Sequence, residues 1–308
     1  MKYLMLGAAA LALAACSQET PTGAEDSAPA DETMNEETMT PTDEMEAAAP
    51  EMSASEKLDA VLAAEPDDVK ARYQYRHPKE TLEFFGVEPG MTVVDILPGQ
   101  PGWYGKILVP YLGSDGTLIG AEYPVEMWAK FGGDYSGEEF LESRRTFPQD
   151  YVAAVDELAG EDGANAAAFL IGSMPAELEG TADVVMMMRA AHHFNRIDDG
   201  AYWEVALADI NAVLKPGGIV GVVQHRAPEE NSDDWAVGNA GYLKQSQVVS
   251  VFEDAGFELV EASEINANPN DRPTEDDIVW RLPPSNDSTE AAEIGESDRM
   301  TLKFKKPE

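Results

Sequence analysis

Short apolar runs alternate with amphipathic helical segments along most of the chain. The runs have the length and the apolar content of strands that are covered on both faces, and Pro, Gly or Asp-Gly turns separate them from the helices. Seven strands are predicted, at residues 91–97, 117–122, 166–171, 182–188, 219–224, 257–262 and 300–305. The predicted helices are 55–64, 78–85, 103–112, 137–159 with a break at Pro148, 202–214 and 245–255. This alternation predicts one doubly wound α/β domain with a mostly parallel sheet.

The first sixteen residues carry a different signal. Lys2 is followed by an apolar run at 4–15, which ends in Leu-Ala-Ala-Cys at 13–16. The run is too short to span a bilayer, which takes about 20 residues, and its basic start and small residues are typical of an export signal. Leu-Ala-Ala-Cys resembles the lipobox of bacterial lipoproteins, which implies cleavage after residue 15 and a lipid on Cys16. The alternative is an ordinary secretory signal with an incidental cysteine.

Cysteine content favours the lipid. Cys16 is the only cysteine of the chain, so it has no disulfide partner, and a free thiol is a liability in an oxidising compartment. Ser17 rather than Asp follows it, which resembles the pattern of lipoproteins sent to an outer membrane. We therefore expect an exported protein that is anchored to the cell envelope through Cys16, on the periplasmic side of the outer membrane.

Charge divides the rest of the chain into a tether and a domain. Residues 17–54 hold eleven Asp or Glu and no Lys or Arg, which predicts a disordered acidic tether over 16–54. The domain at 55–308 has 47 Asp and Glu against 20 Lys and Arg. Such a surface repels phosphate backbones, so nucleic acid is not an expected partner. The expected partners are a small-molecule substrate and the membrane; the oligomeric state is left open.

The loop after the first strand is the best candidate for a binding site. Residues 95–104 read Asp-Ile-Leu-Pro-Gly-Gln-Pro-Gly-Trp-Tyr, and ligands of doubly wound sheets bind where strands end and strand order reverses. Gly99 and Gly102 permit a sharp turn and a close backbone approach. Glu122 ends the next strand, where a carboxylate can accept from both hydroxyls of a ribose. Gly-rich turns are common, but this position indicates a nucleotide-type site. The three-glycine fingerprint of nicotinamide-dependent dehydrogenases is absent, so that class fits worse.

Several segments together resemble the class I S-adenosylmethionine-dependent methyltransferases. They are VVDILPGQPGWY at 93–104, GAE at 120–122, ADVVMMMRAAHHF at 182–194, LKPGG at 214–218 and FEDAGFELVEAS at 252–263. The loop looks like that of a bacterial group of predicted methyltransferases with a Pro-Gly-Gly-Gly-Trp-Tyr type sequence. The resemblance covers residues 68–306. It implies a Rossmann-like, doubly wound, seven-stranded and mostly parallel sheet with an antiparallel last strand, and S-adenosylmethionine as cofactor.

The resemblance also implies roles for single positions. The implied cofactor-binding residues are Asp95, Pro98, Gly99 and Gly102 around the methionine part, Glu122 at the ribose, Ser173 and Met174 at the adenine, and Arg189 after the fourth strand. Two departures from the family pattern matter. Pro98 and Pro101 remove backbone donors from the loop, and Ser173 stands where the family often has a carboxylate.

Methyl transfer requires mainly that donor and acceptor are held in line, and a base helps when the acceptor is a hydroxyl or a carbon acid. The candidate catalytic residues are His192, His193 and Tyr104, with His225 as a further histidine. Each histidine has the alternative of being a helix-start or surface residue. No metal site is predicted, because four histidines without a second cluster or a cysteine make one improbable.

Two functions stay open from the sequence. One is methyl transfer to a small acceptor, and the other is a non-catalytic ligand-binding or structural lipoprotein with the same fold. Residues 72–77, Arg-Tyr-Gln-Tyr-Arg-His, precede the first predicted strand and are interpreted either as a lid or as a segment that wraps the domain.

Overall fold

The computed structural model describes residues 52–308. The predicted signal peptide, the lipid at Cys16 and most of the predicted tether lie outside the described residues. The first helix, α1 (Ala54–Ala64), starts at a capping box in which Ser53 and Glu56 each accept a hydrogen bond from the other's backbone nitrogen. Between residues 52 and 308, none of the helices is long and apolar enough to cross a membrane.

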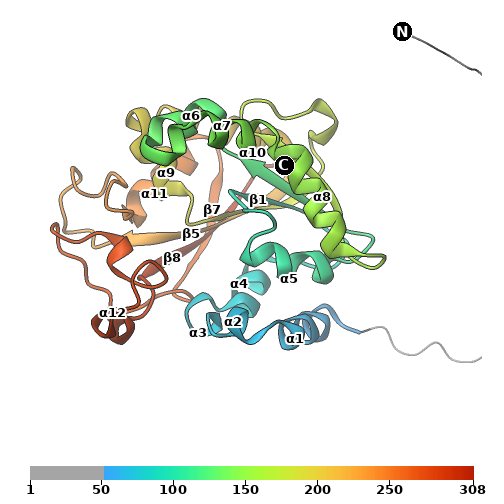
Figure 1. Ribbon diagram of the computed structural model, residues 1–308, viewed down its shortest axis with the longest axis horizontal. Helices are drawn as coiled ribbons and strands as arrows, with labels where there is room; N and C mark the ends of the chain where they lie inside the picture. The colour runs from blue at the N-terminus through green and yellow to red at the C-terminus, as the bar shows by residue number, and fades with distance from the viewer. Residues whose placement is uncertain (1–51) are drawn as a thin grey trace, which may run out of the picture. The chain divides into compact units, whose positions relative to one another are not determined.

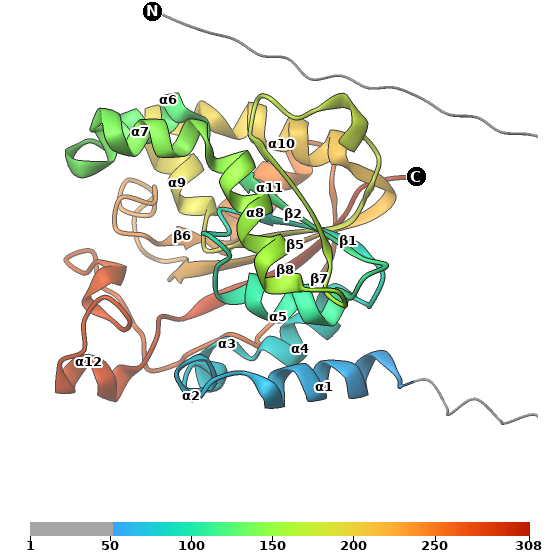
Figure 2. The same ribbon diagram turned by 45° about the vertical axis from the view of Figure 1, so that its right-hand side comes forward.

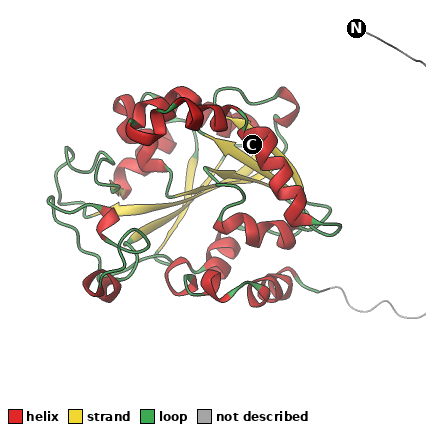
Figure 3. Cartoon of the chain, in the orientation of Figure 1, coloured by secondary structure: helices red, strands yellow, loops and turns green. Residues whose placement is uncertain are grey.

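A mostly parallel sheet lies between the helices (Figure 3). Its strands follow the order β3-β2-β1-β4-β5-β8-β7, and the two-residue β6 pairs with β5. The only antiparallel pairings among these strands are those of β8 with β5 and with β7. The strands are β1 (Thr92–Ile96), β2 (Thr117–Glu122), β3 (Asn165–Leu170), β4 (Ala182–Met188), β5 (Leu214–Ala227), β6 (Leu243–Lys244), β7 (Glu258–Ser263) and β8 (Arg299–Lys305). The predicted fold class, with its antiparallel last strand, is confirmed.

The order of the strands reverses next to β1. The chain runs outward from β1 through β2 to β3 and then returns to β4 on the other side of β1. Ile96 at the end of β1 pairs in register with Met187 near the end of β4. The loop after β1 and the segment after β4 therefore flank the crevice in which doubly wound sheets bind their ligands.

Helices cover both faces of the sheet (Figure 1). One buried apolar cluster joins the sheet to α1, α4, α5 and α8, and a second joins it to α6, α9, α10 and α11. The helices are α2 (Asp67–Lys70), α3 (Tyr73–Arg76), α4 (Pro78–Phe85), α5 (Trp103–Leu112), α6 (Val125–Phe131), α7 (Glu138–Arg145), α8 (Phe147–Ala159), α9 (Ala191–Arg196), α10 (Tyr202–Val213), α11 (Gln245–Asp254) and α12 (Thr289–Ile294), besides α1. Side chains alternate along β1: Val94 and Ile96 face the second cluster, and Val93 faces the first.

Most element boundaries lie within one residue of those predicted, and two regions differ by more. β5 begins at Leu214 rather than at residue 219, because Leu214 pairs with Ala182 and Gly217 and Gly218 exchange backbone hydrogen bonds with Lys306. The helical region at 137–159 breaks at Thr146, so Pro148 lies in the first turn of α8. Its lack of an N–H removes no helix hydrogen bond at this position.

The long connection between β7 and β8 packs against α3, as Figure 2 shows near α12. Three arginines, among them Arg76 of α3, pair with Glu296 of this connection, and a side chain at Gly295 would meet the ring of Tyr75 at 2.6 Å. Asn266 donates to Thr81 and to Thr301 over 3.0 Å each. Of the two interpretations of residues 72–77, the structure agrees with a wrapping segment.

Candidate active site

The loop after β1 turns very tightly. Leu97 and Gly99 have φ angles of 57° and 79°, in the left-handed region. Gly102, which begins α5, lies so close to the loop that a Cβ there would be 1.7 Å from the carbonyl oxygen of Pro98. The two glycines predicted for the site therefore have distinct roles: Gly99 supplies the turn and Gly102 supplies the space.

Asp95 lies at the base of this loop and is 3% exposed. It shares a face of β1 with Val93, and this face packs against α5 and α8. Burial raises the pKa of Asp95 to about 7, although the positive charge of Arg189 acts in the opposite direction. Near neutral pH the carboxyl group can thus exchange its proton when a ligand or a charge approaches.

The raised pKa of Asp95 predicts a pH-dependent stability difference for Asp95→Asn. The folded-state pKa lies above the ordinary value near 4, so the native carboxylate becomes costly as pH rises from about 4 to about 7, and Asn does not carry this cost. We expect the stability of the variant relative to wild type to increase by about 2–3 kcal/mol between pH 5 and pH 8. Urea unfolding of both proteins at the two pH values measures it, and a pH-independent difference would contradict it.

Glu122, at the end of β2, is 1% exposed and fully engaged with protein donors. Its Oε1 accepts from the backbone nitrogen of Tyr123 at 2.7 Å and from Nε1 of Trp128 at 3.2 Å. Its Oε2 accepts from Nη1 of Arg144 at 3.1 Å. Burial nevertheless raises the pKa of Glu122. The carboxylate predicted for a ribose is therefore covered by α6 and α7.

An aromatic cluster holds α6 and α7 over Glu122. The ring of Trp128 lies 4.9–5.6 Å from those of Tyr123, Phe131, Tyr135 and Phe140. Sequence reasoning missed both α6 and Arg144. The signal for α6 was weak, since the helix has seven residues and begins after Pro124 without a side-chain cap.

The two residues predicted at the adenine lie in the turn after β3. Ser173 is exposed, and its nitrogen donates to the carbonyl of Leu170 at 2.8 Å. Met174 packs at the margin of the second apolar cluster. A carboxylate does reach this turn from elsewhere: Oδ2 of Asp209, on α10, accepts from the nitrogen of Gly172 at 2.6 Å. No local sequence pattern connected Asp209 with residues 37 positions earlier.

His192 follows β4, and its two ring nitrogens have different surroundings. The amide nitrogen of Gln224 donates to the carbonyl of Gly241 at 2.9 Å, so its oxygen faces Nδ1 of His192 at 3.4 Å. This arrangement assigns the proton to Nδ1 and leaves Nε2 as an acceptor. Nε2 is buried and has no hydrogen-bond partner within residues 52–308. Burial lowers the pKa of His192 to about 3, which keeps the ring neutral.

The other predicted catalytic residues have protein partners. Nδ1 of His193 lies 3.0 Å from the hydroxyl of Tyr123, and burial lowers the pKa of His193. The Tyr104 hydroxyl is 3.5 Å from the carbonyl of Arg76, and burial raises its pKa to about 12. His225 has its Nδ1 2.5 Å from the hydroxyl of Ser297, and its ring lies 5.7 Å from that of His192. Among these groups, His192 is the one whose Nε2 is buried without a partner within residues 52–308.

Arg189 occupies the first position after β4. It has a φ of 63°, and its backbone nitrogen donates to the carbonyl of Val223 at 2.6 Å. A non-glycine residue in this region is uncommon and often marks a functional site. Burial and the charge of Arg299 lower the pKa of Arg189 to about 10.

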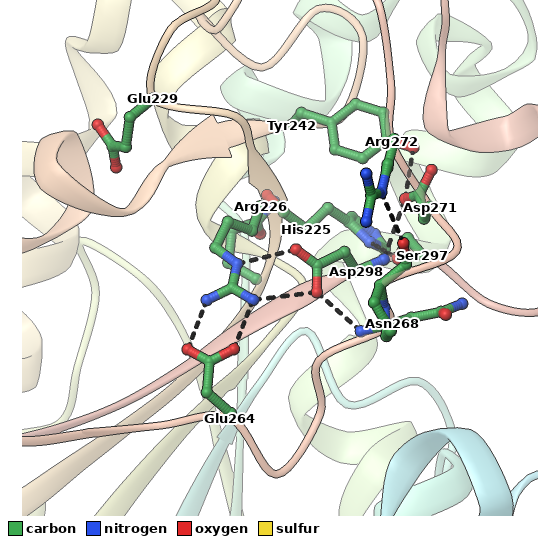
Figure 4. A network of polar contacts seen from close by, with 12 residues as sticks. His225, Arg226, Glu229, Tyr242, Glu264, Asn268, Asp271, Arg272, Ser297 and Asp298 are labelled. Atoms are coloured by element: carbon green, nitrogen blue, oxygen red, sulfur yellow. Dashed lines mark hydrogen bonds and ion pairs between the residues drawn. The ribbon is translucent and has the colours of Figure 1, made fainter.

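A second polar region, shown in Figure 4, lies at the carboxyl end of β5 beside a cavity of about 530 Å³. Arg226 pairs there with Glu264 at 2.7 Å and with Asp298 at 2.8 Å. Asp271 accepts from Tyr242 at 3.0 Å and pairs with Arg281 at 2.6 Å. These charged groups pair with one another, so the network braces the β7–β8 connection. In the described part of the chain, no group of three His, Cys, Asp or Glu residues could hold a metal ion.

The loop and the segment after β4 fit an adenosyl ligand better than the end of β2 does. Gly99 is exposed and the loop is shaped by Gly102, while the partnerless Nε2 of His192 lies after the neighbouring strand. Glu122 can accept hydrogen bonds from ribose hydroxyls only if the groups that now donate to it, above all Arg144, move away. The residues fit the cofactor on condition that α7 moves.

The fold and the site define a doubly wound α/β domain with a tight glycine loop at its reversal point. No protein-family model matches the chain, and no curated protein matches it either. Solved structures similar to it include a SAM-dependent methyltransferase from Aquifex aeolicus, with 13% identity, coverage of 78% of this chain and 98% of that chain, and a TM-score of 0.46. Another is the [4+2]-cyclase SpnF, with 14% identity, coverage of 83% and 96%, and a TM-score of 0.46.

A third similar structure is the 1,6-didemethyltoxoflavin-N1-methyltransferase of Burkholderia thailandensis, which was solved with S-adenosylhomocysteine. It has 12% identity, coverage of 84% of this chain and 93% of that chain, and a TM-score of 0.42. Likenesses of this size do not assign the activity of any of these proteins to the chain.

Proposed function

We propose that this chain binds S-adenosylmethionine and transfers its methyl group to a small acceptor that is not a nucleic acid. The observation that carries the proposal is the pairing of a tight glycine loop after β1 with a neutral, partnerless histidine nitrogen after β4, at the reversal point of the sheet. The motif resemblance at residues 93–104, 182–194 and 214–218 supports the same function.

The residues have separable tasks in this proposal. When bound, the cofactor supplies an electrophilic methyl group. Asp95, Gly99 and Gly102 would hold its methionine part, and Glu122 would hold its ribose. Nε2 of His192 would take the proton that a hydroxyl or carbon acid loses as it is methylated. Burial keeps this nitrogen unprotonated, and the lowered pKa makes it a weak base, which suits an acceptor whose own proton is acidic.

We also propose that the domain works outside the cytoplasm, held to the envelope by lipid on Cys16. The Leu-Ala-Ala-Cys sequence at 13–16 and the lack of any other cysteine support this location. The location bears on the chemistry, because the cofactor would have to be available in the same compartment.

A second function, ligand binding without catalysis, is favoured by one specific observation. Arg144, Trp128 and the backbone of Tyr123 together occupy the acceptor positions of Glu122 that a ribose would need. Pro98 and Pro101 also lack the N–H groups that a loop offers to a ligand. A lipoprotein that kept the fold and lost the transfer reaction would show these features.

Calorimetric titration of the full-length chain in detergent with S-adenosylmethionine and S-adenosylhomocysteine tests the proposal. We expect both ligands to bind with micromolar to submillimolar affinity, weaker than with an open ribose site, because α7 must move first. Absence of heat from both ligands at millimolar concentration would reject methyl transfer and leave the non-catalytic function.

A further inference from the structure

Three arginines pair with one carboxylate beside the proposed site, and a fourth arginine lies next to them. Arg72, Arg76 and Arg299 all pair with Glu296, Arg72 through Nε at 2.7 Å and Arg76 through Nε at 3.7 Å. They come from α3, from the residue just before it and from the start of β8, and Glu296 precedes β8. Glu296 is 2% exposed, Arg76 is 5% and Arg299 is 2%. The pairing is therefore buried, and one negative charge is shared by three positive ones.

Arg189 lies next to this cluster. Its backbone nitrogen donates to the carbonyl of Val223 in β5, and Val223 pairs across the strands with Thr301, two residues from Arg299. Burial, and after it the charge of Arg189, lowers the pKa of Arg76 to about 9, and burial and the charge of Arg299 lower the pKa of Arg189. Within residues 52–308 the guanidinium of Arg189 has no hydrogen bond and no ion pair with a carboxylate. The charge of Arg189 acts on Asp95, but burial is the larger effect and raises the pKa of that carboxyl to about 7.

Two guanidinium nitrogens of the cluster have no hydrogen-bond acceptor. Nε of Arg76 and Nε of Arg299 are buried without a hydrogen-bond partner in the described chain. Arg76 also lies over the ring of Trp103, 4.6 Å from its centre, and Nη1 of Arg299 donates to the carbonyl of Tyr75. These contacts orient the guanidinium groups, but they neutralise none of their charge.

The excess charge is unusual for this chain. The formal net charge is −37, yet three arginines share the single carboxylate of Glu296, and Arg189 beside them has no ion pair within residues 52–308. Buried like charges are costly unless an anion compensates them, and planar guanidinium groups are suited to carboxylate and phosphate. A small anion would relieve the cost and use the free donors.

The position of the cluster connects it to the proposed reaction. Arg189 and His192 belong to the same short segment after β4, and His225, whose ring is 5.7 Å from that of His192, pairs across the strands with Arg299. An anion held by these arginines therefore lies beside the proposed base. We infer that the arginine cluster binds an anionic group, carboxylate or phosphate, of the methyl acceptor, an inference that rests on the proposed function.

The test uses the full-length chain and three probes with the same ring: benzoate, phenyl phosphate and benzamide. We expect benzoate or phenyl phosphate to bind at least about tenfold more tightly than uncharged benzamide. The preference between the first two separates a carboxylate site from a phosphate site. Benzamide binding as tightly as both anions would overturn the inference.

Two variants give the matched comparison. Arg189→Gln should weaken anion binding about tenfold, and Arg189→Lys should weaken it less, because it keeps the charge but not the planar fork. Arg226→Gln removes the same charge from an arginine already paired with Glu264 and Asp298, and it should leave anion binding unchanged. If Arg189→Gln does not fold, two results still test the inference. They are the preference of wild type for the anionic probes over benzamide and the weaker anion binding of Arg189→Lys. Equal binding by wild type and a folded Arg189→Gln would refute the assignment.

The carboxylate of the cofactor is the other source of such an anion, and two adenosyl ligands distinguish it. S-adenosylhomocysteine carries that carboxylate, and 5′-methylthioadenosine lacks it. Weaker binding of the first alone in Arg189→Gln would assign the cluster to the cofactor and overturn the inference. A different result would reject methyl transfer and retain the anion site: neither adenosyl ligand binds to wild type, but benzoate binds in a way that depends on Arg189.

Discussion

Replacing Gly102 with Ala is expected to abolish adenosyl-ligand binding and to destabilise the domain by about 2–3 kcal/mol. The added Cβ would lie 1.7 Å from the carbonyl oxygen of Pro98 and 3.0 Å from its carbonyl carbon. Both are backbone atoms at the end of β1, so no side chain can rotate away to make room. The loop must open, and opening it displaces Gly99 and the start of α5 together. Titration with S-adenosylhomocysteine and urea unfolding measure the two effects.

The matched control is Gly137→Ala. Gly137 also precedes a helix, α7, and it has an ordinary φ of −69°, with the nearest atom 3.5 Å from an added Cβ. Loss of glycine at this position should cost no more than about 1 kcal/mol and weaken ligand binding far less than Gly102→Ala does. If Gly102→Ala bound S-adenosylhomocysteine as wild type does, the tight loop would not be the cofactor site.

Local sequence pattern predicted most of the secondary structure, because each strand and each long helix carries its own signal. The helices at 78–85 and 103–112 and the strands at 117–122 and 182–188 have the boundaries that were predicted. Their limits coincide with Pro and Gly residues or with changes in apolar period, which act within a few residues. β5 shows the limit of this reasoning, since its first five residues are extended only through pairing with β4 and with residue 306.

The candidate site was predicted only in part, because its decisive contacts join distant residues. The glycine loop and the histidines after β4 were visible as motifs. The pairing of Arg144 with Glu122 spans 22 positions, and that of Arg72 with Glu296 spans 224. No short pattern marks an arginine as the partner of a particular carboxylate, so the covering of Glu122 and the arginine cluster emerged only from the arrangement of the strands and of the β7–β8 connection.

Replacing Glu122 with Ala is expected to destabilise the domain by about 2–4 kcal/mol. The substitution leaves Nε1 of the buried Trp128 and the backbone nitrogen of Tyr123 without their acceptor, and it removes the partner of Arg144. Arg144 keeps 17% side-chain exposure and can turn to water, so the cost falls below that of a fully buried pair. Glu122→Gln retains an acceptor for Trp128 and should lose about half as much. Urea unfolding of both variants measures the difference.

A double-mutant cycle with Arg144→Met separates the ion pair from the other contacts. If Arg144 pairs with Glu122 in solution, the two changes should be non-additive by about 1–2 kcal/mol. The same variant also bears on function: a freed Glu122 could accept ribose hydroxyls, so Arg144→Met should bind S-adenosylhomocysteine more tightly than wild type. Additive stabilities would show that α7 does not close over Glu122 in solution. Strong coupling with no adenosyl binding even in Arg144→Met would leave Glu122 as a structural residue and favour the non-catalytic function.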